Sequence, residues 1–144
     1  MIGRRPPTRN VALVAAGGAI GAVVRVALAA WFPVVEGSFP WTTFVENVAG
    51  AFALAFTLSL LAERVAARPE VRLLVCTGAL GAFTTYSTLA VEVDRLAAGG
   101  HPLTATGYAV TSVVVGLAAA LVGLRVGRVW PRSRRSGRGR GTAP

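Results

Sequence analysis

The chain of 144 residues has a formal net charge of +9, a mean hydropathy of +0.59 and 53% hydrophobic residues. A soluble domain distributes its charges along the chain, whereas these charges occupy short stretches between long apolar runs. All fifteen basic residues are arginines, and most stand at the ends of those runs, where arginine marks membrane topology; this excludes a nucleic-acid-binding protein in spite of the high isoelectric point.

Four segments are long and apolar enough to cross a bilayer, which requires about 20 largely apolar residues. They predict transmembrane helices at about 11–31, 41–62, 71–94 and 103–127 within a single domain of residues 1–130. The short connections leave no room for a soluble catalytic domain. Residues 131–144, rich in Arg, Ser and Gly, are typical of a disordered cytoplasmic tail. The expected fold class is therefore an all-α integral membrane protein.

The arginines predict the orientation of the chain. Thirteen of them precede the first span, lie between the second and third spans or follow the fourth, which places them all on one side of the membrane. Arg95 is on the opposite side, and Arg25 is inside the first span. Because arginine-rich segments stay in the cytoplasm, we expect a multi-pass protein of the plasma membrane with both termini cytoplasmic.

In the first span, Gly17, Gly21 and Arg25 recur every four residues and therefore share one helix face. Small residues at this spacing allow another helix to approach closely. An arginine is costly against lipid, so Arg25 is expected to face an aqueous vestibule or a protein partner. The alternative is that it extends to the nearby interface with its charged end in water.

The second span carries Thr43, Asn47 and Gly50 on one stripe. An asparagine in a membrane helix more often joins helices than lines a pore. Glu46 is the unusual residue here, because a carboxylate inside an apolar span must be protonated or paired. Arg25 is the candidate partner.

The third span is uncharged over residues 73–91, and its centre, near residue 82, is crowded with glycines and hydroxyl side chains. Glycine and β-branched threonine are poor helix formers, which favours an opening of the helix there. Open backbone at that depth survives only where protein buries it or where it coordinates a ligand. The alternative is an unbroken helix whose hydroxyls bond to their own carbonyls, and composition alone favours neither.

In the fourth span Thr104, Tyr108, Ser112 and Gly116 recur every four residues, which by itself predicts a packing face. The chain has no catalytic constellation. Its single histidine, His101, lies in a loop and is interpreted as a bystander. We therefore do not expect an enzyme.

Three motifs, in this order along the chain, resemble those of the CrcB/Fluc family of fluoride channels. The first, GGxxGAxxR, is matched at every fixed position from Gly17 to Arg25. A second, approximately GTLxVNxxGxF, is matched by Thr43, Asn47, Gly50 and Phe52. The third, approximately GFxGGxTTFSTF, is highly specific and is matched by Gly78, Gly81, Thr84, Thr85, Ser87 and Thr88. The resemblance covers nearly the whole chain except the tail.

The resemblance implies an antiparallel dimer with two pores along the subunit interface. It also implies a third helix broken at the midplane and a structural sodium ion on the dimer axis, held by the backbone carbonyls of Gly81 and Thr84. The implied function is a fluoride-selective channel that lowers cytoplasmic fluoride by passive efflux and so confers fluoride resistance.

The implied fluoride path includes an asparagine amide, hydroxyl groups and aromatic ring edges. Its residues in this sequence are Arg25, Thr43, Asn47, Tyr86, Ser87, Thr88, Leu89, Tyr108 and Ser112. Two departures from the family stand out. The family's two phenylalanines are replaced by Tyr86, which keeps a ring edge, and by Leu89, which has none. Glu46 replaces an apolar residue beside the asparagine.

These departures keep two alternatives open. One is a small proton-coupled four-helix exporter that uses Glu46, and the other is a non-conducting partner subunit that completes another chain's pore. The arginine bias bears on the dimer, because an antiparallel homodimer requires each chain to insert in both orientations. A strong bias favours a heterodimer with a paralogue of opposite orientation over a homodimer.

Overall fold

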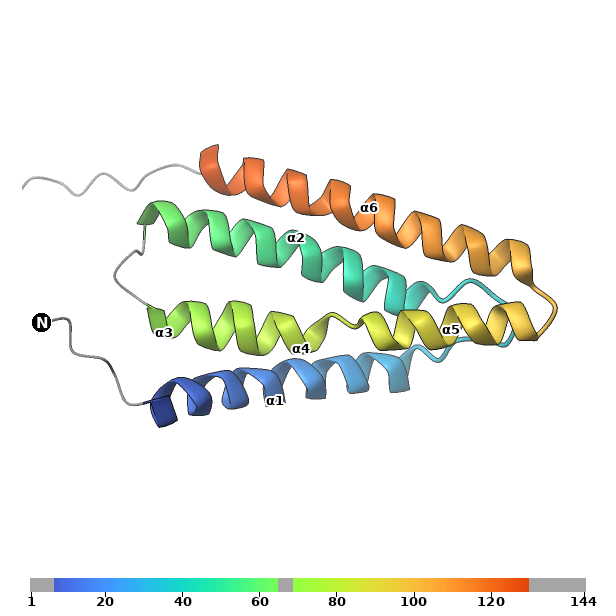
Figure 1. Ribbon diagram of the computed structural model, residues 1–144, viewed down its shortest axis with the longest axis horizontal. Helices are drawn as coiled ribbons and strands as arrows, with labels where there is room; N and C mark the ends of the chain where they lie inside the picture. Colours follow the sequence, from blue (N-terminus) through green and yellow to red (C-terminus); the bar gives the residue numbers. More distant parts are fainter. Residues whose placement is uncertain (1–6, 65–68, 130–144) are drawn as a thin grey trace, which may run out of the picture.

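The computed structural model describes residues 7–64 and 69–129, all of them in helices or short connections (Figure 1). Helix α1 is Pro7–Trp31 and α2 is Trp41–Arg64. The third span consists of α3 (Pro69–Val71), the π-helix η1 (Arg72–Leu80), α4 (Gly81–Phe83) and α5 (Tyr86–Ala98), and α6 is Pro102–Val129. Four helical segments are long and apolar enough to cross a membrane, as predicted. The expected tail, 131–144, lies outside the described residues.

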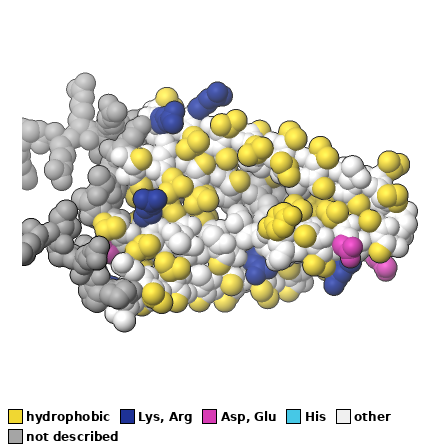
Figure 2. Space-filling view, in the orientation of Figure 1, with side chains coloured by type: hydrophobic (Ala, Val, Ile, Leu, Met, Phe, Trp, Pro, Cys, Tyr) yellow, Lys and Arg dark blue, Asp and Glu magenta, His cyan; other side chains and the backbone are white. Residues whose placement is uncertain are grey.

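Successive spans run in opposite directions, so that α1 begins and α6 ends at the same end of the bundle (Figure 1). Helix α2 packs along α6. The third span packs against α1 through η1 and α4, and against α6 through α5. Hydrophobic side chains spread along the length of the bundle, and most charged side chains lie near its ends (Figure 2). This is the surface expected of a protein that faces lipid.

The turn from α5 to α6 is built by two glycines and a proline. Gly100 has a φ of 83°, a conformation that suits glycine because it has no Cβ. The N–H of His101 donates to the carbonyl of Leu96 at 2.8 Å and closes the turn. Pro102 then starts α6, where a missing N–H costs nothing because the first turn has no intrahelical acceptor.

Glycines bring α1 and η1 into backbone contact, as the first motif predicts. A Cβ on Gly17 would overlap the carbonyl oxygen of Leu74, and one on Gly21 would overlap the carbonyl oxygen of Ala79. From the other side, a Cβ on Gly78 would lie 2.7 Å from the carbonyl oxygen of Val14. No side chain separates the two helices at these points, so the position of η1 is set by the backbone of α1.

The third span is broken, and the break lies at two threonines. Helix α4 ends at Phe83, Thr84 and Thr85 are extended with ψ of 146° and 121°, and α5 begins at Tyr86. Gly81 keeps helical dihedrals, with φ of −65°. The Thr85 side chain accepts the N–H of Thr88 and so starts the new helix. The break therefore lies just beyond residue 82, close to the midpoint where the resemblance implied a broken helix.

Candidate functional site

The side chain of Asn47 holds the break in the third span. Its Nδ2 donates to the carbonyl oxygen of Thr85 at 3.0 Å, and its Oδ1 accepts the Thr85 N–H at 2.8 Å. One amide thus satisfies both backbone groups that the extended residue exposes, as a neighbouring strand would. Because the amide nitrogen carries two hydrogens, one N–H of Asn47 is left for another acceptor.

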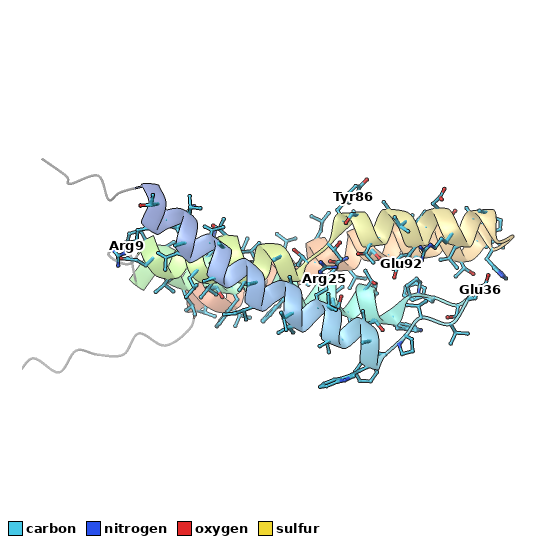
Figure 3. All side chains as sticks on the ribbon, turned by 90° about the horizontal axis from the view of Figure 1, so that it is seen from below. Arg9, Arg25, Glu36, Tyr86 and Glu92 are labelled. Atoms are coloured by element: carbon cyan, nitrogen blue, oxygen red, sulfur yellow. The ribbon has the colours of Figure 1, made fainter. Side chains whose placement is uncertain are left out.

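Hydroxyl groups cluster at the N-terminus of α5. The Oγ1 of Thr85 lies 3.1 Å from the N–H nitrogen of Thr88, 3.0 Å from the Thr88 Oγ1 and 3.2 Å from the Ser87 Oγ. Tyr86 is 83% exposed and points away from the bundle (Figure 3). The first turn of a helix carries the positive end of its dipole and attracts anions. This cluster therefore combines hydrogen-bond donors with the positive end of the α5 dipole, and both favour an anion.

Arg25 reaches the same break from α1 (Figure 3). Its Nε donates to the carbonyl oxygen of Ala82 at 3.2 Å, which satisfies an acceptor at the end of α4. Gly17 and Gly21, on the same face, bring α1 close enough for this contact. The expected pairing of Arg25 with Glu46 is wrong: no ion pair joins these two described residues. The guanidinium is directed to the backbone of the third span instead.

Glu92 links three spans through hydroxyl groups. Its Oε1 accepts from Thr43 Oγ1 at 2.8 Å and its Oε2 accepts from the hydroxyl of Tyr108 at 2.6 Å. Tyr108 is completely buried. Sequence reasoning did not place Glu92 on the site, although it follows Thr85 by seven residues and Thr88 by four. That helical spacing, which predicts that all three share one face at the start of the second half of the third span, was the available signal.

The hydroxyl network around Glu92 adjoins a cavity of about 700 Å³ at the end of the bundle away from the start of α1. The cavity is lined by the α1–α2 loop and the second half of α5, with Glu92, Arg95 and His101 among its residues. Gly37 has a φ of 74°, and a Cβ there would lie 2.6 Å from His101 Nε2. His101, interpreted above as a bystander, thus packs against this loop and borders the cavity.

The predicted path residues do not form one cluster. Thr43, Tyr108 and Ser112 are buried inside the bundle, whereas Tyr86 and Ser87 are on its exposed face. Leu89 packs against the buried apolar cluster that contains Leu96, Ala105 and Tyr108. Leu89 therefore contributes to an apolar core and not to a polar surface.

The two carbonyls expected to hold sodium have lost their helical donors. In a continuous helix the carbonyl of Gly81 would accept from the Thr85 N–H, and that of Thr84 from the Thr88 N–H. These N–H groups bond instead to Asn47 Oδ1 and Thr85 Oγ1. Gly81 is exposed, and a Cβ there would approach only the carbonyl oxygen of Cys76, at 3.7 Å. Carbonyl oxygens without their helical donors are suitable ligands for a hard cation, so this segment fits such an ion.

The sequence has clear relatives. A family model described as "CrcB-like protein, Camphor Resistance (CrcB)" matches residues 12–124. The fluoride-specific ion channel FluC of Agrobacterium fabrum is 40% identical over 120 residues, which cover 83% of this chain and 96% of the relative. FluC of Roseiflexus sp. is 40% identical over 123 residues, covering 85% and 99%. FluC 3 of Streptomyces avermitilis is 44% identical over 119 residues, covering 83% of this chain and 58% of the relative.

Proposed function

This chain belongs to the CrcB/FluC family of fluoride-specific ion channels, and from its geometry we infer that it passes fluoride along the face where Asn47 holds the helix break. The family is one of ion channels and not of enzymes. The observation that carries the proposal is the bonding of Asn47, which fixes the break and leaves one N–H for an anion. Fluoride leaves the cytoplasm passively through such a path, which lowers its cytoplasmic concentration.

A selective fluoride path must replace the water around a small, strongly hydrated anion with well-placed donors. The free N–H of Asn47 and the hydroxyls of Ser87 and Thr88 supply such donors at the start of α5. The ring edge of Tyr86 carries partial positive charge. Arg25 adds a full positive charge beside the break. Together these groups favour an anion at the N-terminus of α5.

The exposed face of the break supports a dimer. Backbone carbonyls are not left against lipid, because lipid offers no donor. A second copy in antiparallel orientation would cover this face and bring the carbonyls of Gly81 and Thr84 from both chains together. A sodium ion bound there supplies a fixed positive charge near the anion path. We expect Gly81→Val to lower the dimer fraction, because its Cβ obstructs the approach of the second chain, and Thr84→Ser to preserve it. Equal dimer fractions, measured by cross-linking in detergent, argue against this arrangement.

The arginine bias places both termini of this chain on the cytoplasmic side of the plasma membrane. It therefore favours a heterodimer with an oppositely oriented paralogue over a homodimer. A partner chain could also supply the aromatic ring that Leu89 lacks. Single cysteines at Gly99 or Gly137, introduced after Cys76→Ser, test the orientation. Labelling of each cysteine from one side only agrees with a fixed orientation, and labelling from both sides removes the basis for a heterodimer.

Ion flux from liposomes tests the proposed function directly. Liposomes containing the purified protein, alone and then with a paralogue of opposite arginine bias, are loaded with fluoride or with chloride. We expect fluoride to leave and the chloride gradient to remain nearly intact. Comparable release of both ions contradicts a fluoride-selective channel.

A further inference from the structure

Glu46 is a buried acidic residue of α2. It is 4% exposed, and its Oε1 has no hydrogen-bond partner among the described residues. Glu92 differs, since both of its oxygens accept from hydroxyls. Glu46 lies next to Asn47 in sequence and nearly one turn after Thr43 on α2. The residue with this unbonded carboxyl oxygen therefore lies at the same depth in the bundle as Asn47, which holds the break.

The charged groups around Glu46 do not form a pair with it. Helix α2 packs against α1, η1, α4, α5 and α6. From α1, Arg25 attracts a negative charge at Glu46, and from α5, Glu92 repels it. From α6, the hydroxyl of Tyr108 interacts with it electrostatically.

The two remaining elements contribute no such group. The titratable residues of η1, Arg72 and Cys76, are not among the groups that act on Glu46. Helix α4 has no titratable side chain. The Arg25 Nε is bonded to the backbone of Ala82. Among the described residues, no ion pair therefore neutralises a negative charge on Glu46.

We propose that Glu46 is a proton-binding site that makes fluoride conduction through this channel rise as the pH falls. This rests on the proposed function. When Glu46 is ionised, its charge repels fluoride from the donors around Asn47. When it takes up a proton from solution, the repulsion disappears and the acid offers an O–H donor in the same layer. No proton moves with fluoride in this scheme, which distinguishes it from a proton-coupled exporter.

The size of the effect follows from electrostatics. A unit charge ~10 Å from an anion, at an effective dielectric constant of ~20, changes the occupancy of the anion on the order of tenfold. We therefore expect the fluoride current of the wild-type protein to increase on the order of tenfold from about pH 8 to about pH 5, with carboxyl titration as the cause. Fluoride current in planar bilayers is the suitable measurement, because hydrogen fluoride crosses lipid as a neutral molecule and carries no current.

Three variants test whether the pH dependence of the current comes from Glu46 or from another carboxyl group. Glu46→Gln and Glu46→Val should give a high current that is independent of pH. Asp94→Asn removes an exposed carboxyl of α5 and should keep the pH dependence of the wild-type current. A wild-type current that does not change with pH, or a Glu46→Gln current that changes as the wild-type current does, overturns the proposal.

A wild-type protein without fluoride current at any pH contradicts the proposed function and not the proton site. Infrared difference spectroscopy on the full-length protein then tests whether Glu46 binds a proton. A carboxylic-acid band that appears on acidification and is missing in Glu46→Gln supports the proton site. The same spectrum in both proteins excludes it.

Discussion

The two halves of the third span are held in different ways. Its first half, η1 and α4, contacts α1 through the backbone at Gly17, Gly21 and Gly78. Its second half, α5, is held by side chains, through the Asn47 amide at Thr85 and the hydroxyls on Glu92. The backbone contact contains no side chain that could change its position. The side chains that hold α5 can instead give up a hydrogen bond and donate to an ion. The first half is thus suited to fix the break in place and the second to bind an anion.

The largest effect is expected for Gly17→Ala, because a Cβ there would overlap the carbonyl oxygen of Leu74. We expect a loss of about 2–3 kcal/mol in the free energy of unfolding, typical of overpacking. Gly18→Ala is the matched control, since nothing lies within 4 Å of its Cβ. It should be neutral or stabilise the helix by about 0.5–1 kcal/mol. Thermal unfolding in detergent measures both, and equal melting temperatures would show that the glycine contact does not hold η1.

A smaller loss of stability, with a large loss of fluoride flux, is expected for Asn47→Ala. It leaves the N–H and carbonyl of Thr85 without partners, but Thr85 is only half-buried, so we expect a loss of ~1–2 kcal/mol, at the lower end of the cost of unsatisfied buried groups. We expect flux to fall on the order of tenfold or more, which corresponds to ~1.4 kcal/mol. Thr111→Ala is the control, because the Thr111 hydroxyl bonds only to carbonyls of its own helix. Liposome flux that is unchanged in Asn47→Ala removes Asn47 from the path.

The smallest change in stability is expected for substitutions of the two tyrosines. Tyr108→Phe deletes the 2.6 Å hydrogen bond to Glu92, for which we expect a loss of about 1 kcal/mol in stability. Tyr86→Phe removes a hydroxyl from a side chain that is 83% exposed and should leave stability unchanged. Denaturation by sodium dodecyl sulfate measures the difference. If both variants unfold alike, the bond to Glu92 does not help to fix α5.

The sequence predicted the four spans and the close α1 contact because apolar length and glycine spacing are local signals. The residues alone placed a possible opening near residue 82 but did not decide whether the helix breaks, because the bonds of Asn47 from another helix open the backbone at Thr84 and Thr85. Glu92 was missed for the same reason: its two hydroxyl partners come from the second and fourth spans. The spacing of Glu92 from Thr85 and Thr88 was visible in the sequence, but its partners on the other spans could not be read from periodicity. The resemblance supplied Gly81 and Thr84, which composition could not have selected.

The reversal potential of the current tests fluoride-selective conduction most directly. Protein in a planar bilayer, alone and then with a FluC chain of opposite arginine bias, is given fluoride on one side and an equal concentration of chloride on the other. We predict a reversal potential close to that of a membrane permeable to fluoride alone, and a loss of the current in Asn47→Ala. A reversal potential near zero, which means equal permeability to fluoride and chloride, would contradict selective fluoride conduction.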